Sequence, residues 1–214
     1  MGKRIKDALI LFAITLVAGI GLGAAYAVTK EPIAQAEYNK TQAAYMEVFE
    51  DADHFEQLED FDSAEATEAA IDELEEQGLS DSTITPEDCT VDDCQVAYDA
   101  SGEEVGYVIT VTSSAGYGGD ITLSVGIQDD DTVNGYSITT INETAGLGMN
   151  AKEEGFSSQF DDKQVDFFTV TKSGSTSDEQ IDAISGATIT SKAVTSAVDV
   201  AIAYDETLDE GGEE

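Results

Sequence analysis

The sequence has few basic residues. Its 214 residues include 9 Lys or Arg against 45 Asp or Glu, which gives a formal net charge of -36. None of the nine lies between Thr41 and Ala151. Such a surface repels nucleic acid and anionic lipid, so neither is expected as a partner of the soluble part. The acidic residues are scattered without the spacing of a metal loop, which favours a role in solubility or salt adaptation.

Histidine and cysteine are also scarce. The single histidine, His54, lies in an acidic run and supports no Ser-His-Asp arrangement. Cys89 and Cys94 are the only cysteines, and two thiols without a companion His or Cys pair make a poor zinc site. In an oxidising compartment they could close a small loop, and the sequence leaves open whether they are bridged. We therefore expect no metal and no catalytic side chain.

Charged residues are absent from Ala8 to Thr29, which are mostly apolar. At about 1.5 Å per residue, this stretch spans a hydrocarbon core of roughly 30 Å. Three basic residues precede it: Lys3, Arg4 and Lys6. The positive-inside rule then predicts a cytoplasmic N-terminus (1–7), one transmembrane helix (8–29) and an extracytoplasmic bulk, in a single-pass protein of the cell membrane. The alternative is a cleaved signal peptide with a peptidase site at 25–27, but the apolar stretch is long for that role.

Residues 30–94 read as a helical, membrane-proximal and acidic segment. Glu31-Pro32 is a helix-start signal, and a helix is expected from Ile33 to Phe55. Ser63 can cap a second helix, Ala64 to Gln77, which Gly78 ends. The stretch from Ser80 to Asp93 is polar and loop-like.

Residues 95–204 carry the signature of a mixed domain. Ile121, Leu123, Val125 and Ile127 alternate with small or polar residues, which predicts a strand with one buried face. Further elements are expected as a strand over Val133–Ile141, a short helix over Lys152–Phe160, a strand over Val165–Thr171 and a helix over Ser191–Tyr204. This order predicts an α+β domain with a twisted, mainly antiparallel sheet packed by helices. The acidic tail, 205–214, is expected to be disordered.

The first motif lies between the last strand and the last helix. It runs Asp182-Ala-Ile-Ser-Gly-Ala-Thr188-Ile-Thr-Ser191. A hydroxyl there lies at a helix N-terminus, where unpaired backbone N–H groups attract a phosphate. The alternative is a plain strand-to-helix turn, with Gly186 in the bend and Ser or Thr as the N-cap.

Two glycine-rich segments precede this motif. They are Gly116-Tyr117-Gly-Gly-Asp-Ile121 and Glu143-Thr144-Ala-Gly146-Leu147-Gly148. Glycines let the backbone approach a flat ring closely and adopt positive φ. Thr144 and the following N–H groups could bond the polar edge of such a ring, and Glu143 could order the loop or lie near the ring. A hairpin turn and a glycine-rich connector are the simpler alternatives.

In this order, the three segments resemble the FMN-binding subunits of membrane electron-transport complexes. The resemblance is closest to the G subunit of Rnf (Rsx-type) ion-translocating electron transport complexes, and next to the C subunit of Na⁺-translocating NADH:quinone reductases. One departure is Ala145, where those proteins usually have Pro. The resemblance implies FMN bound covalently through a phosphoester to Thr188, with Asp182 and Ser185 recognised by a flavin transferase. The cofactor-binding residues that it implies are Thr188, Ser185, Gly186, Ala187, Thr190, Ser191, Glu143, Thr144, Gly146, Leu147, Gly148 and Tyr117.

The function implied is electron transfer within a membrane-bound, ferredoxin:NAD⁺-type ion-translocating oxidoreductase. The chain would be a redox component beside other integral membrane subunits rather than a self-contained enzyme. One alternative is a stand-alone extracytoplasmic flavoprotein for extracellular electron transfer or reduction. Another is a colourless acidic surface domain that binds a protein or cations.

Overall fold

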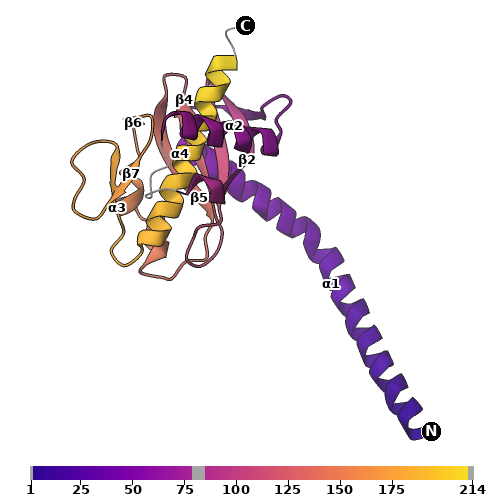
Figure 1. The fold of residues 1–214 in the computed structure, drawn as a ribbon. Coiled ribbons are helices and arrows are strands. Elements are labelled where there is room, and N and C mark those ends of the chain that lie inside the picture. Colours follow the sequence, from indigo (N-terminus) through magenta and orange to yellow (C-terminus); the bar gives the residue numbers. More distant parts are fainter. Residues whose placement is uncertain (1, 79–84, 212–214) are drawn as a thin grey trace. The chain divides into compact units, whose positions relative to one another are not determined.

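The computed structural model describes residues 2–78 and 85–211, which fall into two compact units, Met1–Gln42 and Ala43–Glu214. Helix α1 (Gly2–Val48) forms the described part of the first unit and contributes its last residues to the second (Figure 1). It runs through Pro32, where a new helix was expected. Proline removes only one backbone donor, and the helix continues around it. An 18-residue window of α1 has a mean hydropathy of 2.4, so the helix is long and apolar enough to cross a membrane.

The second unit is built on a six-stranded antiparallel sheet. Its strands follow one another in the order β1 to β6. They are β1 (His54–Gln57), β2 (Cys89–Tyr98), β3 (Glu104–Ser113), β4 (Ile121–Gln128), β5 (Thr132–Thr140) and β6 (Lys163–Gln164). The four alternating apolar side chains of β4 are almost completely buried, as their period of two predicted. Sheet and helices together confirm the α+β class.

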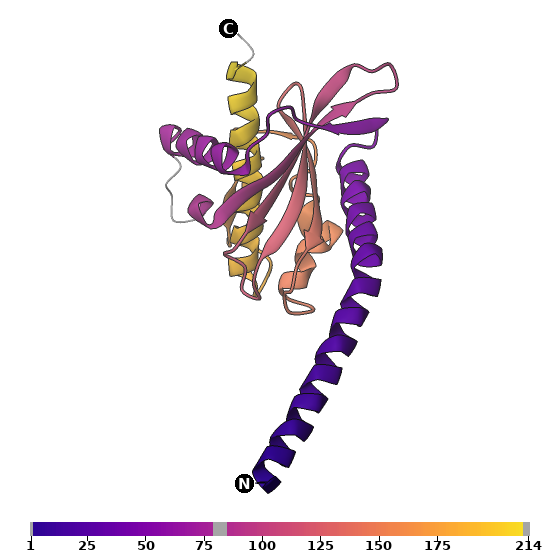
Figure 2. The ribbon, with the colours of Figure 1, turned by 90° about the vertical axis from the view of Figure 1, so that its right-hand side faces the viewer.

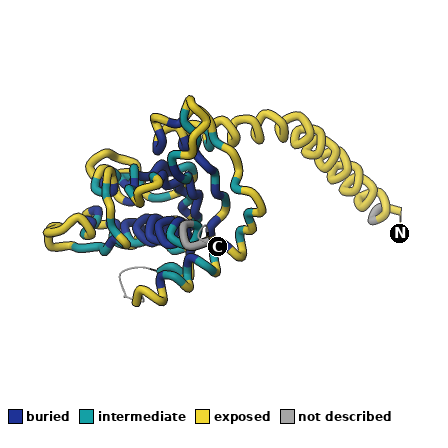
Figure 3. The backbone as a smooth tube through the Cα atoms, turned by 90° about the horizontal axis from the view of Figure 1, so that it is seen from above, coloured by how far each residue is buried: buried dark blue, intermediate teal, exposed yellow. Residues whose placement is uncertain are grey.

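Helix α4 (Thr188–Gly211) packs against one face of the sheet, with α2 (Ser63–Glu76) beside it (Figure 2). From Thr190 to Asp205 every α4 residue except Lys192 is buried, so this helix is the centre of the core (Figure 3). Its buried residues include polar ones, among them Ser191, Thr195 and Asp199, beside the apolar face that packs on the sheet. The N-cap of α2 is Asp62, whose carboxylate accepts from Ala64 N and Glu65 N, rather than the expected Ser63.

A second, smaller cluster lies on a different set of sheet residues. Tyr45 and Val48 of α1, with Phe49 and Ala52 that follow, pack against Ala97 and Val108. The Tyr45 hydroxyl donates to Asp93 Oδ2 over 2.8 Å, and the Val48 carbonyl accepts from Asn134 Nδ2 over 3.0 Å. These contacts explain why the helix ends at Val48 rather than at Phe55, since Phe49 and Ala52 must turn into the core.

Two short strands stand apart from the main sheet. β7 (Thr169–Thr171) and β8 (Gln180–Asp182) pair in parallel with each other only. The connection from β5 contains η2 (Gly148–Lys152) and α3 (Glu154–Ser157), in place of one short helix over 152–160. β7 begins later than the expected strand at Val165, because Phe168 is fully buried and its N–H donates to Asp199 of α4.

Several expected boundaries differ from the structure. The stretch expected to be helical or loop-like contains β1, the 3₁₀ helix η1 (Pro86–Asp88) and the start of β2, while 79–84 lie outside the described residues. α4 extends to Gly211, past the point where a disordered tail was expected, because Leu208 still packs on the core. Residues 212–214 of that tail lie outside the described residues.

The structure also answers the question of the cysteines. Cys89 and Cys94 are free, buried thiols at the start and middle of β2. Five steps along a strand separate Cα atoms by about 16 Å. A disulfide requires less than about 7 Å between them, so the two cannot bridge.

Candidate functional site

One cavity brings the three sequence motifs together. Its volume is about 550 Å³, within the range of roughly 300–1,000 Å³ typical of ligand pockets. It is lined by Tyr117, Glu143, Thr144, Leu147, Gly148, Gly186, Ala187, Thr188, Ile189 and Thr190. Three segments separated by more than twenty residues along the chain therefore meet at the start of α4.

The motif from Asp182 to Ser191 forms a turn that leads directly into this helix. Ala187 N donates to Ile184 O over 2.9 Å, and Gly186 has a φ of 79°. A positive φ at the third of four residues, with none at the second, is typical of a type II turn and favours glycine there. Thr188 is then the first residue of α4. A strand-to-helix turn and a phosphate site are therefore compatible here, because the turn places Thr188 at the N-terminus of α4.

Ser191 fastens this turn from inside. Its side chain is fully buried, and its Oγ accepts from Ile184 N over 2.9 Å and donates to Ala187 O over 3.0 Å. Its own N–H donates to Ala187 O. Ser191 therefore faces away from the cavity and offers a ligand neither its hydroxyl nor its amide, unlike the sequence-based expectation.

Glu143 joins the two glycine-rich loops. Its Oε1 accepts from Tyr117 N over 2.8 Å and from Gly118 N over 3.2 Å. A Cβ atom on Gly118 would lie 2.3 Å from the Asn142 carbonyl oxygen, so only glycine allows the loops to approach this closely. Glu143 is thus engaged with backbone, and its expected ordering of the loop agrees with these contacts.

The cavity has an apolar rim. Tyr117 is 74% exposed, Leu147 41% and Ile189 51%. Within the described parts of 47–211, these are the large apolar side chains that remain exposed. Three such side chains around one hollow, on an otherwise acidic surface, suit a flat aromatic ligand.

The structure also separates residues that were predicted together. Ser185, Gly146 and Ser191 do not line the cavity, although the first two belong to its turns. Ile189 lines it and was not predicted. Its only signal in the sequence is that it is a large apolar residue within the motif, at a position outside the buried stripe of the helix.

The chain is similar to known flavin-binding proteins over the segments that form this cavity. Residues 116–203 match the FMN-binding domain family. The chain is 33% identical over 200 residues to the G subunit of the Na⁺-translocating ferredoxin:NAD⁺ oxidoreductase complex of Acetobacterium woodii, covering 92% of this chain and 89% of that protein. The chain belongs to the G-subunit family of ion-translocating oxidoreductase complexes.

Further similarity within the G-subunit family is local. To the G subunit of the proton-translocating ferredoxin:NAD⁺ oxidoreductase complex of Clostridium ljungdahlii, the identity is 47% over 98 residues, or 46% of this chain. The chain spans about half (52%) of that relative. Among solved structures, the C subunit of the Na⁺-translocating NADH-quinone reductase from Parabacteroides distasonis is similar with a TM-score of 0.43 at 25% identity, covering 52% of this chain and 60% of that one.

The residues of this member of the G-subunit family fit an FMN group. The N–H groups of the first three α4 residues have no acceptor within the helix, and the helix dipole adds positive potential for a phosphate. The apolar rim suits the isoalloxazine ring. Gly186 keeps the floor open, because a Cβ there would lie 3.1 Å from Leu147 Cδ2.

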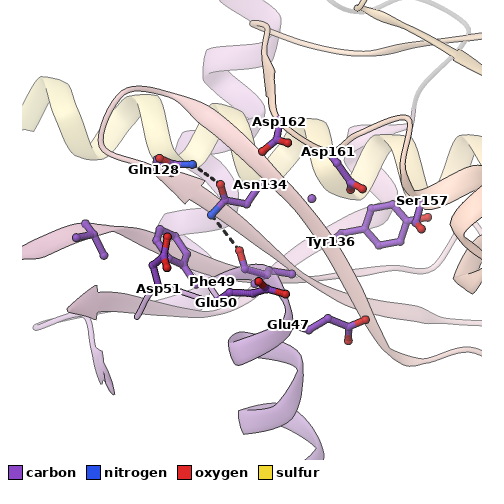
Figure 4. A pocket seen from close by; sticks show the side chains of 13 residues that line it. Glu47, Phe49, Glu50, Asp51, Gln128, Asn134, Tyr136, Ser157, Asp161 and Asp162 are labelled. Atoms are coloured by element: carbon purple, nitrogen blue, oxygen red, sulfur yellow. Dashed lines mark hydrogen bonds between the residues drawn. The ribbon is translucent and has the colours of Figure 1, made fainter. Parts of the chain in front are cut away.

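A second cavity, of about 560 Å³, lies where the end of α1 meets β4 and β5 (Figure 4). Asn134 bridges Gln128 Nε2 and the Val48 carbonyl there. Several carboxylates line it, and burial raises the pKa of Asp161 above its usual value. Over the described residues, no group of three or more His, Cys, Asp or Glu has an arrangement that could hold a metal. We attribute this cavity to the way the last turn of α1 packs on the sheet, and assign it no ligand.

Proposed function

We propose that this chain is the electron-transfer subunit of a membrane-bound ferredoxin:NAD⁺-type ion-translocating oxidoreductase, and that it carries FMN covalently on Thr188. The observation that carries this proposal is the convergence of the three motifs on one cavity, with Thr188 at the first position of α4. Membership of the G-subunit family supports the assignment to the complex.

The covalent step is a phosphoryl transfer. A bond forms between Thr188 Oγ and the flavin phosphorus, and the phosphoanhydride of a flavin-nucleotide donor breaks. The nucleoside monophosphate leaves, and the hydroxyl proton passes to a base of the flavin transferase. Asp182 and Ser185, beside the acceptor, are the residues that we assign to recognition by that transferase.

The remaining residues hold the group. The N–H groups from Thr188 to Thr190 bind the phosphate, and the backbone after Thr144 borders the ring. Tyr117, Leu147 and Ile189 exclude water from the ring faces. When bound, FMN supplies the electron-carrying chemistry, for which no side chain is required. A covalent tether maintains a high effective concentration where a released flavin would be diluted.

The membrane arrangement follows from α1. We place residues 8–29 across the cell membrane and 1–7 in the cytoplasm, because Lys3, Arg4 and Lys6 precede the apolar stretch. Residues 30–94 then lead to an extracytoplasmic FMN-binding domain, 95–204, to which β1 and β2 add structurally. Other integral membrane subunits of the complex are the proposed electron partners.

The local claim is tested by mass spectrometry of the full chain co-produced with a flavin transferase. We expect one FMN less one water on wild-type protein, and none on Thr188→Ala. Thr176→Ala, which removes an exposed hydroxyl outside the cavity, is the matched control and should keep the flavin. An unmodified wild-type chain, or modification that persists in Thr188→Ala, would contradict the proposal.

The assignment to a complex needs a separate test. Mild detergent extraction of the native membrane should yield the chain together with several integral membrane proteins. Purification of an active, flavin-bearing chain alone would instead support the stand-alone flavoprotein.

A further inference from the structure

The acceptor turn begins at a strand that lacks a neighbour on one side. β8 pairs with β7 on one edge, where Ala183 N donates to Thr171 O over 2.8 Å. Within the described residues no strand pairs with its other edge. The backbone groups of Asp182 on that edge must find other partners, because unpaired groups of a part-buried strand are unfavourable.

The side chain of Gln159 provides these partners. Its Oε1 accepts from Asp182 N over 2.7 Å, and its Nε2 donates to Asp182 O over 3.3 Å. One side-chain amide thus makes the pair of bonds that a neighbouring strand would make. The Nε2 group also donates to Phe156 O over 3.3 Å, which requires the nitrogen, not the oxygen, to face the two carbonyls.

Gln159 stands on a rigid base. The residue after it, Phe160, is fully buried and makes edge-to-face contacts with Tyr136, Phe156 and Phe168. The Phe160–Phe168 ring centroids are 4.9 Å apart. Because this aromatic cluster belongs to the core, it fixes the position of Gln159 and hence the position of Asp182.

We infer that Gln159 is a positioning residue for flavin attachment: it holds the strand edge at Asp182 so that the turn and Thr188 are presented to the transferase in one conformation. This inference rests on the proposed function. Ser191 holds the turn at its helix end, and Gln159 holds it at its strand end, six residues before Thr188. For a transferase that binds only the ordered turn, the apparent Kd is the intrinsic Kd divided by the fraction of chains in which the turn is ordered. A smaller ordered fraction therefore weakens binding.

The test uses the full, unmodified chain in detergent, with wild type, Gln159→Ala and Gln159→Glu. The Glu variant keeps the size and the acceptor for Asp182 N but loses the donors to Asp182 O and Phe156 O, so it should protect the Asp182 amide better than the Ala variant does. In Gln159→Ala, hydrogen exchange at the Asp182 amide should become about tenfold faster, the factor for one net hydrogen bond. The KM of the transferase for the chain should rise by a similar factor, with kcat retained. Gln57→Ala, an exposed glutamine on β1, is the control and should change neither quantity.

An unchanged KM and unchanged Asp182 exchange in Gln159→Ala would overturn the inference. So would faster exchange spread equally over the β4 amides, because that pattern means global destabilisation. If wild type accepts no flavin at all, the proposed function fails instead, and the exchange at Asp182 still decides whether Gln159 orders this strand.

Discussion

Gly148 lies so close to Thr190 that a Cβ atom on Gly148 would stand 2.6 Å from Thr190 Oγ1. The same atom would stand 2.7 Å from Glu143 Oε2. Residue 148 therefore sets the separation between the second glycine-rich loop and the helix that bears Thr188. The absence of one side chain allows the cavity to form with both walls in contact.

Substitution of this glycine should damage the site directly. Gly148→Ala should lower the free energy of unfolding by about 1–3 kcal/mol, as overpacking does, because the side chains of Thr190 and Glu143 must both move. Thermal denaturation measures this effect, and the yield of covalent flavin should fall with it. Gly155→Ala is the matched control, since nothing lies within 4 Å of its added methyl group. Equal behaviour of the two variants would show that the loop and the helix are not in tight contact.

Ser191 gives a second prediction, on the turn itself. Ser191→Ala leaves the Ile184 N–H without its acceptor inside the core, which should lower the free energy of unfolding by about 1–3 kcal/mol. Native-state hydrogen exchange at the Ile184 amide should accelerate before the rest of the domain opens. Ser158→Ala, at an exposed helix end, should change stability by less than about 0.5 kcal/mol. If the Ile184 amide remained protected from exchange in Ser191→Ala, Ser191 would not be what holds this turn.

Asp199 makes the stability of the domain depend on pH. It is fully buried, its Oδ1 accepts from Phe168 N over 2.8 Å, and its Oδ2 has no hydrogen-bond partner among the described residues. Burial raises the pKa of this carboxyl well above its usual value. The folded state therefore keeps a proton that the unfolded chain releases near pH 4. The stability from this group is complete below that pH and is lost as the pH rises through the folded-state pKa.

Asp199→Asn retains a neutral group of the same shape, so it should remove this dependence. The variant should match wild type near pH 4 and exceed it by about 1 kcal/mol or more at pH 7. Urea denaturation at several pH values measures the difference. Asp72→Asn removes the same charge at an exposed position and controls for net charge. Parallel stability curves for wild type and Asp199→Asn across pH 4–8 would refute the prediction.

The local features of this protein were determined by its sequence alone. The uncharged stretch from Ala8 to Thr29 and the alternation in β4 depend on composition and on a period of two, which neighbouring residues specify by themselves. The type II turn is of the same kind, because Gly186 supplies the positive φ that the turn needs. The motif from Asp182 to Ser191 could therefore be identified without any coordinates.

Only the tertiary structure decided which side chains hold the turn of that motif in place. The sequence names Ser191 and Gln159 but does not say where their side chains point. The Ser191 side chain points inward because α4 is buried, and the Gln159 amide reaches Asp182 because, among the described strands, β8 has a free edge. The bond from Gln159 to Asp182 crosses 23 positions of the chain, and that from Glu143 to Tyr117 crosses 26. Such contacts arise from the packing of distant segments, and local propensity carries no information about which of them will meet.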